Sequence, residues 1–215
     1  ERLFWDPGVM PSDVATRAAQ KVIEASGIDP KKIGVIINAS VCKDYIEPSV
    51  ASIVHAKLGL SPDCVNYDIS NACLGFLNAM ETVSLMIEAG QIEYGLIVDG
   101  EGAREFIEGT IKRLQQPDVD VDTFYKNFAT FTLGSGAVAM ILCHKDKSTS
   151  GHILNGTVSL AATEHNRLCF GQKDFLFTDA KALLIAGVDT AVRTWRVASK
   201  KLTNWSDTTI DKYIP

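Results

Sequence analysis

The stretch NYDISNACLGFLNAMETVSLM, residues 66–86, decides the fold because a strand-like run passes directly into a helix-like run within it. Residues 64–70 contain Val, Tyr and Ile, which favour a strand. Apolar residues then occupy nearly every side of the segment 71–90, which predicts a buried helix ending at Gly90. Cys73 stands where strand becomes helix, so its thiol is either a core group or a group placed to react.

The same alternation of strands and helices runs through the neighbouring sequence. Ser12 or Asp13 can cap the first predicted helix. The run 33–40 is apolar throughout, as is typical of a parallel strand covered on both faces. The alternation predicts an α/β fold with parallel strands. The predicted helices are 11–26, 49–60 and 71–90, and the predicted strands are 33–40, 64–70 and 94–101.

The remaining sequence is less regular. Residues 103–128 are polar and lack a clean period, so we interpret them as an excursion that covers a site or a dimer contact. The polar segment 145–151 is the best candidate boundary, which predicts domains 1–145 and 146–215. The further expected features are a glycine turn and strand at 131–144, a strand at 152–163, a loop at 164–175 and a helix at 179–202.

Bulk properties exclude several classes of protein. A net charge of −5 gives no basic surface for nucleic acid or an anionic membrane. No apolar run approaches the roughly 18–20 residues that span a bilayer, and the first residues do not form a signal-peptide pattern. The five cysteines are widely spaced, without zinc-ligand spacing, which favours reduced thiols in a cytoplasmic protein and no bound metal.

Cys73 is the strongest candidate for chemistry. A thiol at a helix N-terminus faces unpaired backbone N–H groups and the positive end of the helix dipole, which favours the nucleophilic thiolate. Gly75 beside it would leave room for a substrate. The alternative is that Cys73 is simply buried, as cysteines often are. The other cysteines are interpreted as core or loop residues: Cys42, Cys64, Cys143 and Cys169.

Other motifs are weaker. Glu47 follows the strand 33–40, at the sheet edge where α/β proteins bind ligands, so it is either a general base or a solvated loop residue. The segment 99–104, DGEGAR, lacks the third glycine of a dinucleotide site and predicts a plain turn. Gly134 and Gly136 predict close packing or a tight turn next to the site. None of the four histidines pairs with Cys73 by sequence logic, although a Cys–His pair could form in the fold.

Five segments taken together resemble the thiolase superfamily, in its ketoacyl-ACP synthase III branch. They occur in the family's order and spacing: DVATRAAQKVIEASGIDPKKIGVIINAS, DYIEPSVASIVHAKLGL, YDISNACLGFLNAMETVSLMIEAG, LIVDGE and FTLGSGAVAMIL. The glutamate in DYIEPS and the segment ATEHNRLC favour the OleA-type enzymes within that branch. The resemblance implies a layered α/β/α/β/α fold, of which this chain covers most of the N-terminal half and the start of the C-terminal half.

The resemblance also implies an activity. OleA-type enzymes join two fatty acyl-CoA molecules in a non-decarboxylative Claisen condensation, without a cofactor beyond the coenzyme A thioesters. Cys73 matches the acylated nucleophile, whose backbone N–H helps to bind the oxyanion. Glu47 matches the base that acts in the partner subunit's site of a dimer. Gly75, Phe76, Gly134 and Gly136 are expected to lie against the substrate.

Two alternatives stay open beside this function. The chain could be a decarboxylating ketoacyl synthase that uses malonyl-ACP, or a catalytically incomplete subunit that pairs with an identical or different thiolase-like chain. The family also uses a His and an Asn from its C-terminal half, which these 215 residues do not include. We therefore expect a fragment, an incomplete chain or one subunit of a split enzyme.

Overall fold

The protein is described by a computed structural model that covers residues 3–172, 174–206 and 208–213. It divides into two compact units: residues 1–104 with 134–152, and residues 105–133 with 153–215. The segment 105–133 therefore belongs to the same unit as the later part of the chain. The predicted division into thiolase-like halves, 1–145 and 146–215, concerns the family's internal repeat and stays a prediction.

The first unit is built on a four-stranded mixed sheet in the order β2-β1-β3-β4. The first three strands are parallel, as predicted, and β4 runs antiparallel to β3. The strands β1 and β3 are central and almost fully buried, because their Ile, Val and Leu side chains are covered on both faces. The bounds are β1 Ile33–Asn38, β2 Val65–Asp68, β3 Tyr94–Glu101 and β4 Gly136–Cys143.

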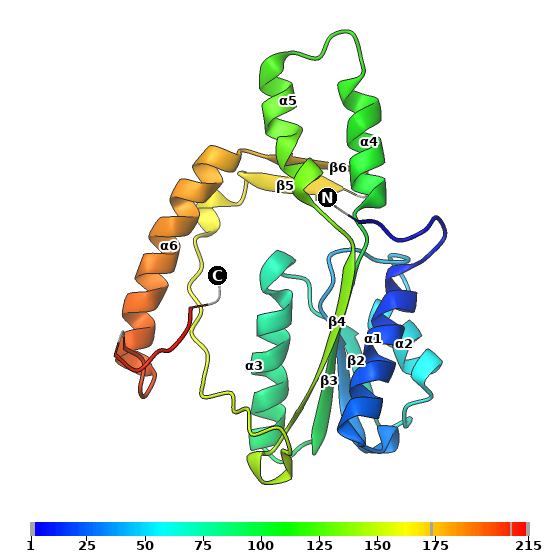
Figure 1. The fold of residues 1–215 in the computed structure, drawn as a ribbon, viewed down its shortest axis with the longest axis vertical. Coiled ribbons are helices and arrows are strands. Elements are labelled where there is room, and N and C mark those ends of the chain that lie inside the picture. Colours follow the sequence, from blue (N-terminus) through cyan, green and yellow to red (C-terminus); the bar gives the residue numbers. More distant parts are fainter. Residues whose placement is uncertain (1–2, 173, 207, 214–215) are drawn as a thin grey trace. The chain divides into compact units, whose positions relative to one another are not determined.

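Helices cover both faces of this sheet (Figure 1). The helices α1, Pro11–Ser26, and α2, Val50–Leu58, pack on one face around Ile36 and Leu96. The helix α3, Gly75–Glu88, packs on the other face around Ile97. The unit thus has three layers, and the carboxyl ends of its three parallel strands meet at one edge.

The start of α1 differs from the predicted capping. Met10 is the N-cap residue, and its backbone N–H donates to the Asp13 carboxylate at 3.1 Å. Pro11 occupies the first helical position, where a missing N–H costs nothing. Ser12 is buried inside the first turn, and its side chain is used in a contact with the loop after β1. The prediction that Ser12 or Asp13 is the N-cap residue is therefore wrong by two or three positions.

The helix α3 is buried on one face only, which corrects the prediction of a helix surrounded by core. Its buried residues follow a single stripe of small and β-branched side chains, from Gly75 through Ala79 and Val83 to Ile87. Leu77 and Leu85, on the outer side, are 54% and 58% exposed. Composition showed that the helix was apolar all round, but only packing shows which side the sheet covers.

The second unit contains helices where the sequence predicted an irregular excursion. The helices α4 and α5 were missed because their buried stripes are short, with Ile107 and Thr110 carrying that of α4. No strand forms over the described residues 152–163, and the predicted loop 164–175 instead enters a hairpin. The predicted helix at 179–202 is confirmed, with Asp179 accepting from Ala182 N at 3.0 Å. The bounds are α4 Arg104–Leu114, α5 Val121–Asn127, β5 Cys169–Gln172, β6 Phe175–Thr178 and α6 Ala180–Lys201.

Short 3-10 turns complete the described chain. They are η1 Pro30–Lys32, η2 Ala72–Leu74, η3 Phe128–Thr132, η4 Lys145–Lys147 and η5 Thr163–His165. Of these, η2 contains Cys73 and joins β2 to α3, so the predicted strand-to-helix passage includes one tight turn.

Candidate active site

Three of the segments singled out in the sequence meet at the carboxyl edge of the first unit's sheet. The loop 39–49 leaves β1 at this edge, and the turn 69–74 leaves β2. The glycine turn 133–135 also lies here, because the antiparallel strand β4 begins beside the end of β3, with Gly136 opposite Glu101. In open α/β sheets this edge is the usual place for ligands.

Cys73 lies in the tight turn η2, immediately ahead of α3. Ala72 adopts φ 44°, in the left-handed region, where a Cβ costs roughly 1–2 kcal/mol. The turn is closed by Leu74 N donating to Asn71 O at 3.0 Å, and Asn71 Nδ2 donates to Asn78 Oδ1 at 2.6 Å. The Cys73 side chain is exposed. The sequence alternative of a core cysteine is therefore excluded for this chain.

The environments of the thiols separate the five cysteines. Burial, together with the charge of Glu101, raises the pKa of Cys42 to about 12, and burial raises the pKa of Cys64 to about 11. Both thiols stay protonated at neutral pH, which makes them poor nucleophiles. The two exposed cysteines are Cys73 and Cys169. Of these, Cys73 lies at the sheet edge described above.

Gly75 has a different role from the one predicted. A Cβ at this position would lie 2.8 Å from the Ala39 carbonyl oxygen and 3.4 Å from that of Ile69. The space beside Gly75 is therefore filled by the ends of β1 and β2, and the missing side chain lets α3 approach the sheet rather than a substrate. Phe76 is half-buried against the core on the α3 side of the sheet.

Substituting Gly75 tests this close approach. Alanine favours a helix over glycine by about 1 kcal/mol, but here its Cβ must displace a backbone carbonyl. We expect Gly75→Ala to lower the free energy of unfolding by about 1–3 kcal/mol, measured by urea denaturation. Gly187→Ala is the matched control, because Gly187 lies inside α6 with open space around its Cα, and it should raise stability. Equal stabilisation by both substitutions would contradict the packing role.

Glu47 lies on an exposed part of the loop 39–49. Its neighbours Tyr45 and Ile46 are 58% and 94% exposed, so the loop tip projects from the unit. Within the described part of the chain, the side chains of Glu47 and Cys73 make no hydrogen bond to each other. The structure places them on separate loops of the same sheet edge.

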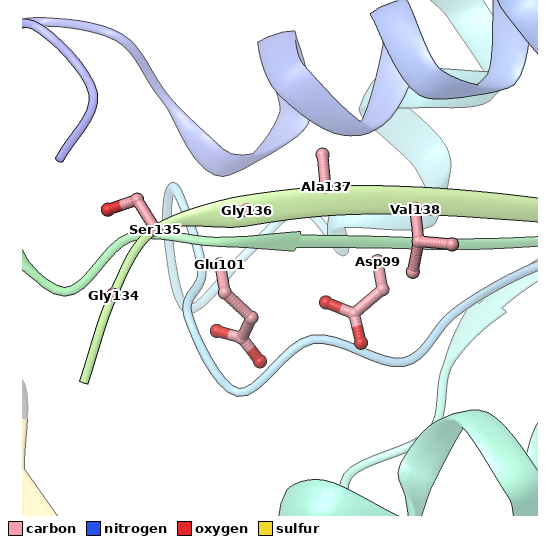
Figure 2. A pocket seen from close by; sticks show the side chains of 7 residues that line it. All are labelled: Asp99, Glu101, Gly134, Ser135, Gly136, Ala137 and Val138. Atoms are coloured by element: carbon pink, nitrogen blue, oxygen red, sulfur yellow. The ribbon is translucent and has the colours of Figure 1, made fainter. Parts of the chain in front are cut away.

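An open pocket of about 420 Å³ lies at the adjoining ends of β3 and β4. Figure 2 shows the carboxylates of Asp99 and Glu101 and the side chain of Val138 on one side of these strands. Gly134 and Gly136 line the same pocket. A Cβ at Gly136 would meet open space, so close packing, one of the two predicted reasons for this glycine, is wrong.

The acidic pair was overlooked in the sequence, where residues 99–104 were interpreted as a turn. The strand β3 ends at Glu101, as the predicted strand 94–101 does, so Asp99 and Glu101 are two residues apart in one strand and share one face. Gly100 between them faces α1, and a Cβ there would lie 2.3 Å from the Pro11 carbonyl oxygen. Two acidic residues spaced by two at the end of an apolar strand were the signal that could have revealed the pair.

Burial, with a smaller contribution from the charge of Glu101, raises the pKa of Asp99 from 3.8 to about 6. The folded protein therefore holds the proton of the Asp99 carboxyl group more tightly than the unfolded chain does. As the pH rises from about 4 to about 6, the contribution of Asp99 to the free energy of unfolding is lost.

We expect Asp99→Asn to remove that loss. Thermal unfolding should show a gain over the parent protein near pH 8, on the order of 1 kcal/mol after allowance for solvent screening, and a smaller gain near pH 5. Asp63→Asn, at an exposed turn, controls for the loss of one charge. An equal gain at both pH values would count against the raised pKa.

The described residues contain no cluster of three or more His, Cys, Asp or Glu side chains that could hold a metal ion. Among the same residues, no helix has the length and apolar character needed to cross a membrane.

Comparison with known proteins shows which family this chain resembles. The family model of 3-oxoacyl-[acyl-carrier-protein (ACP)] synthase III matches residues 67–159, which include Cys73. An acyl-CoA:acyl-CoA alkyltransferase of Xanthomonas campestris pv. campestris is 42% identical over 99% of this chain, and one of Shewanella oneidensis is 38% identical over all of it. A solved structure of Xanthomonas campestris OleA, a cysteine-to-serine variant with lauric acid and lauroyl-CoA, superimposes over 98% of this chain with a TM-score of 0.94 and 41% identity.

The chain is OleA-like. The resemblance stated from the sequence motifs is thereby confirmed, and so is the thiolase-like fold. The OleA-like chain spans 63% and 64% of the length of the two curated relatives and 62% of the solved OleA chain.

Proposed function

We propose that this protein is an acyltransferase that condenses two long-chain acyl-CoA molecules through an acyl-enzyme on Cys73. One observation carries the proposal: an exposed thiol stands on a strained turn at the ligand-binding edge of an OleA-like sheet. Four groups of atoms must then cooperate, namely the thiol, an oxyanion site, a base and an acyl-binding surface.

The first half-reaction is transfer of one acyl group. The Cys73 thiolate attacks the thioester carbonyl carbon of an acyl-CoA, and the carbonyl oxygen takes the negative charge. The tetrahedral intermediate collapses with loss of the coenzyme A thiolate, which leaves the acyl group on Cys73. Backbone N–H groups at the η2 turn, that of Cys73 included, are suited to bind the oxyanion because they lie ahead of a helix N-terminus.

The second half-reaction needs a base because an acyl-CoA has no carboxylate to lose. In the proposal, the Glu47 carboxylate removes the α-proton of a second acyl-CoA, and the resulting carbanion attacks the acyl thioester. The Cys73 thiolate then leaves, and a β-ketoacyl product forms. Glu47 projects outward on its loop, which suits action in the site of a second subunit.

The solved structures of Xanthomonas campestris OleA support these two roles. They include variants at one cysteine, one glutamate and one histidine. In that protein the cysteine follows the glutamate by as many residues as Cys73 follows Glu47 here. One of the structures holds lauric acid and lauroyl-CoA, which supports a long-chain thioester as the substrate class.

The remaining assignments are proposals of the same kind. Phe76, Gly134 and Gly136 border the acyl-binding space, and the working unit is a dimer of thiolase-like chains. No cofactor beyond the coenzyme A thioesters enters these steps. Five free thiols are consistent with a cytoplasmic location.

Supplying acyl-CoA without any malonyl donor tests the proposal. We expect intact-mass analysis to show one acyl group on the protein, peptide mapping to place it on Cys73, and product analysis to show a β-keto acid or its derived ketone. Product only in the presence of malonyl-ACP would favour the decarboxylating ketoacyl synthase. Product only after addition of a second thiolase-like chain would favour the incomplete subunit. Lack of acylation with every donor would overturn the proposal.

A further inference from the structure

The loop that carries Glu47 is held by carboxylates of its own unit. We propose that Asp44 is a positioning residue that holds the loop 41–49 on the N-terminus of α1 and thereby places Glu47 for catalysis. The inference rests on the proposed function of Glu47 as the base. In this proposal Asp44 does not touch the substrate and acts through the backbone that it anchors.

Asp44 makes two contacts with the same residue of α1. Its Oδ1 accepts from Ser12 N at 2.9 Å, and its Oδ2 accepts from Ser12 Oγ at 2.5 Å. Ser12 is the second residue of the helix, so its N–H has no partner within the helix, and the helix dipole favours a negative charge there. Asp44 is only 7% exposed, so these are buried, charge-assisted hydrogen bonds.

A lysine from α2 orients the Ser12 hydroxyl. Lys57 Nζ donates to Ser12 Oγ at 2.7 Å and to Asp13 Oδ1 at 2.7 Å. Because a lone pair of Oγ accepts from Lys57, the hydroxyl proton is free to point at Asp44. The same ammonium group forms an ion pair with Asp13. The contact therefore joins α1, α2 and the Glu47 loop in one network.

Glu101 holds the start of the loop from the end of β3. Its two carboxylate oxygens accept from Val41 N at 2.7 Å and from Cys42 N at 3.0 Å. These hydrogen bonds satisfy two consecutive backbone donors, so the chain leaves β1 in a fixed direction.

Asp68 holds the end of the loop from the end of β2. Its carboxylate accepts from Val50 N at 3.2 Å and from Ala51 N at 2.9 Å, at the first turn of α2. It also forms an ion pair with Lys43 at 3.2 Å. The loop is thus held at its start, middle and end, and the exposed segment 45–48 is left as a short projecting arm.

Asp44 is the anchor within the loop on the N-terminal side of Glu47. It precedes Glu47 by three residues, a span of at most about 10 Å of extended chain, and α2 begins only three residues after Glu47. A catalytic base must be placed within roughly 0.5 Å, which a loop achieves only when its backbone is held by other groups. Asp44 supplies that support with a single buried side chain.

The test separates the two half-reactions. Asp44→Ala should slow condensation on the order of 10-fold or more while Cys73 acylation by acyl-CoA stays within about twofold, because only the second step uses Glu47. Asp44→Asn, which keeps an acceptor for Ser12 N, should recover part of the loss. Asp63→Ala and Asp63→Asn repeat both changes at an exposed turn and should leave both steps unchanged. Equal loss in both half-reactions, or in neither, would overturn the positioning role.

Hydrogen exchange of the wild-type and variant proteins supplies a readout that needs no turnover. Asp44→Ala should increase exchange of the peptide 41–49 at least about 10-fold, with the β3 peptide unchanged. Unchanged exchange in the loop would overturn the proposal. If Asp44→Ala does not fold, Ser12→Ala removes the hydroxyl contacts with Asp44 and Lys57 but keeps the backbone contact between Ser12 N and Asp44, and should show the same pattern more weakly. Because exchange is independent of activity, failure of the proposed condensation and failure of the Asp44 anchor give different results.

Discussion

Cys73→Ala is expected to abolish acylation of the protein. The substitution removes the thiol that carries the acyl group in the proposal, and the Cys42 thiol in the neighbouring loop is a poor substitute because burial raises its pKa to about 12. We expect the mass increase after incubation with a long-chain acyl-CoA to disappear and condensation to fall about 10³-fold or more. Intact-mass spectrometry measures the first effect, and product chromatography measures the second.

The control for this prediction is the other exposed cysteine. Cys169 lies in the β5–β6 hairpin of the second unit, and its Sγ lies 3.4 Å from Thr178 Oγ1. Cys169→Ala should retain the acyl adduct and full condensation. An adduct that survives Cys73→Ala and vanishes with Cys169→Ala would show that Cys169, and not Cys73, carries the acyl group. That result would remove the main support of the proposed mechanism.

Glu47→Gln is expected to stop condensation while leaving acylation intact. Glutamine keeps the size of the side chain but cannot accept a proton as a base, and general base catalysis contributes roughly 10²–10⁴-fold to rate. We therefore expect the acyl-enzyme on Cys73 to accumulate and the β-keto product to fall by a similar factor. Single-turnover mass spectrometry follows the adduct, and product analysis follows the second step.

Glu88→Gln serves as the matched control, because Glu88 is exposed at the end of α3, away from the carboxyl edge of the sheet. It should behave as the parent protein. Normal condensation by Glu47→Gln without a malonyl donor would show that another group removes the α-proton. Loss of acylation by the same variant would show that Glu47 supports the first step or the fold instead.

Much of the first unit could be predicted from the sequence. The helix at 11–26 and the strand at 94–101 were found with their observed bounds, because the helix has helical apolar spacing, the strand has a short apolar run, and a glycine follows each of them. The helices α4 and α5 could not be recognised, because their short buried stripes are masked by charged residues. The hairpin β5–β6 was missed because all four residues of β5 are exposed, so no buried alternation marks that strand.

The candidate site divides in the same way. Cys73 and Glu47 stand out because turn position and resemblance mark them, and their catalytic roles stay predictions. The contacts of Asp44 and Glu101 could not be recognised, because their partners are distant in sequence. Asp44 meets Ser12 across 32 residues, and Glu101 meets Cys42 across 59. Asp44 carries no local pattern that distinguishes it from a solvated loop residue, and the local signal for Glu101 is only its spacing of two from Asp99 at the end of β3.

The sequence by itself determined that residues 66–86 pass from strand to helix with Cys73 at the junction, because periodicity and turn chemistry act over a few residues. The tertiary structure decided the rest. It showed that Cys73 is exposed on a strained turn, that Gly75 makes room for Ala39 rather than a substrate, and that carboxylates distant in sequence hold the Glu47 loop. The physical reason is that hydrogen bonds and close backbone contacts between distant segments exist only after the chain has folded.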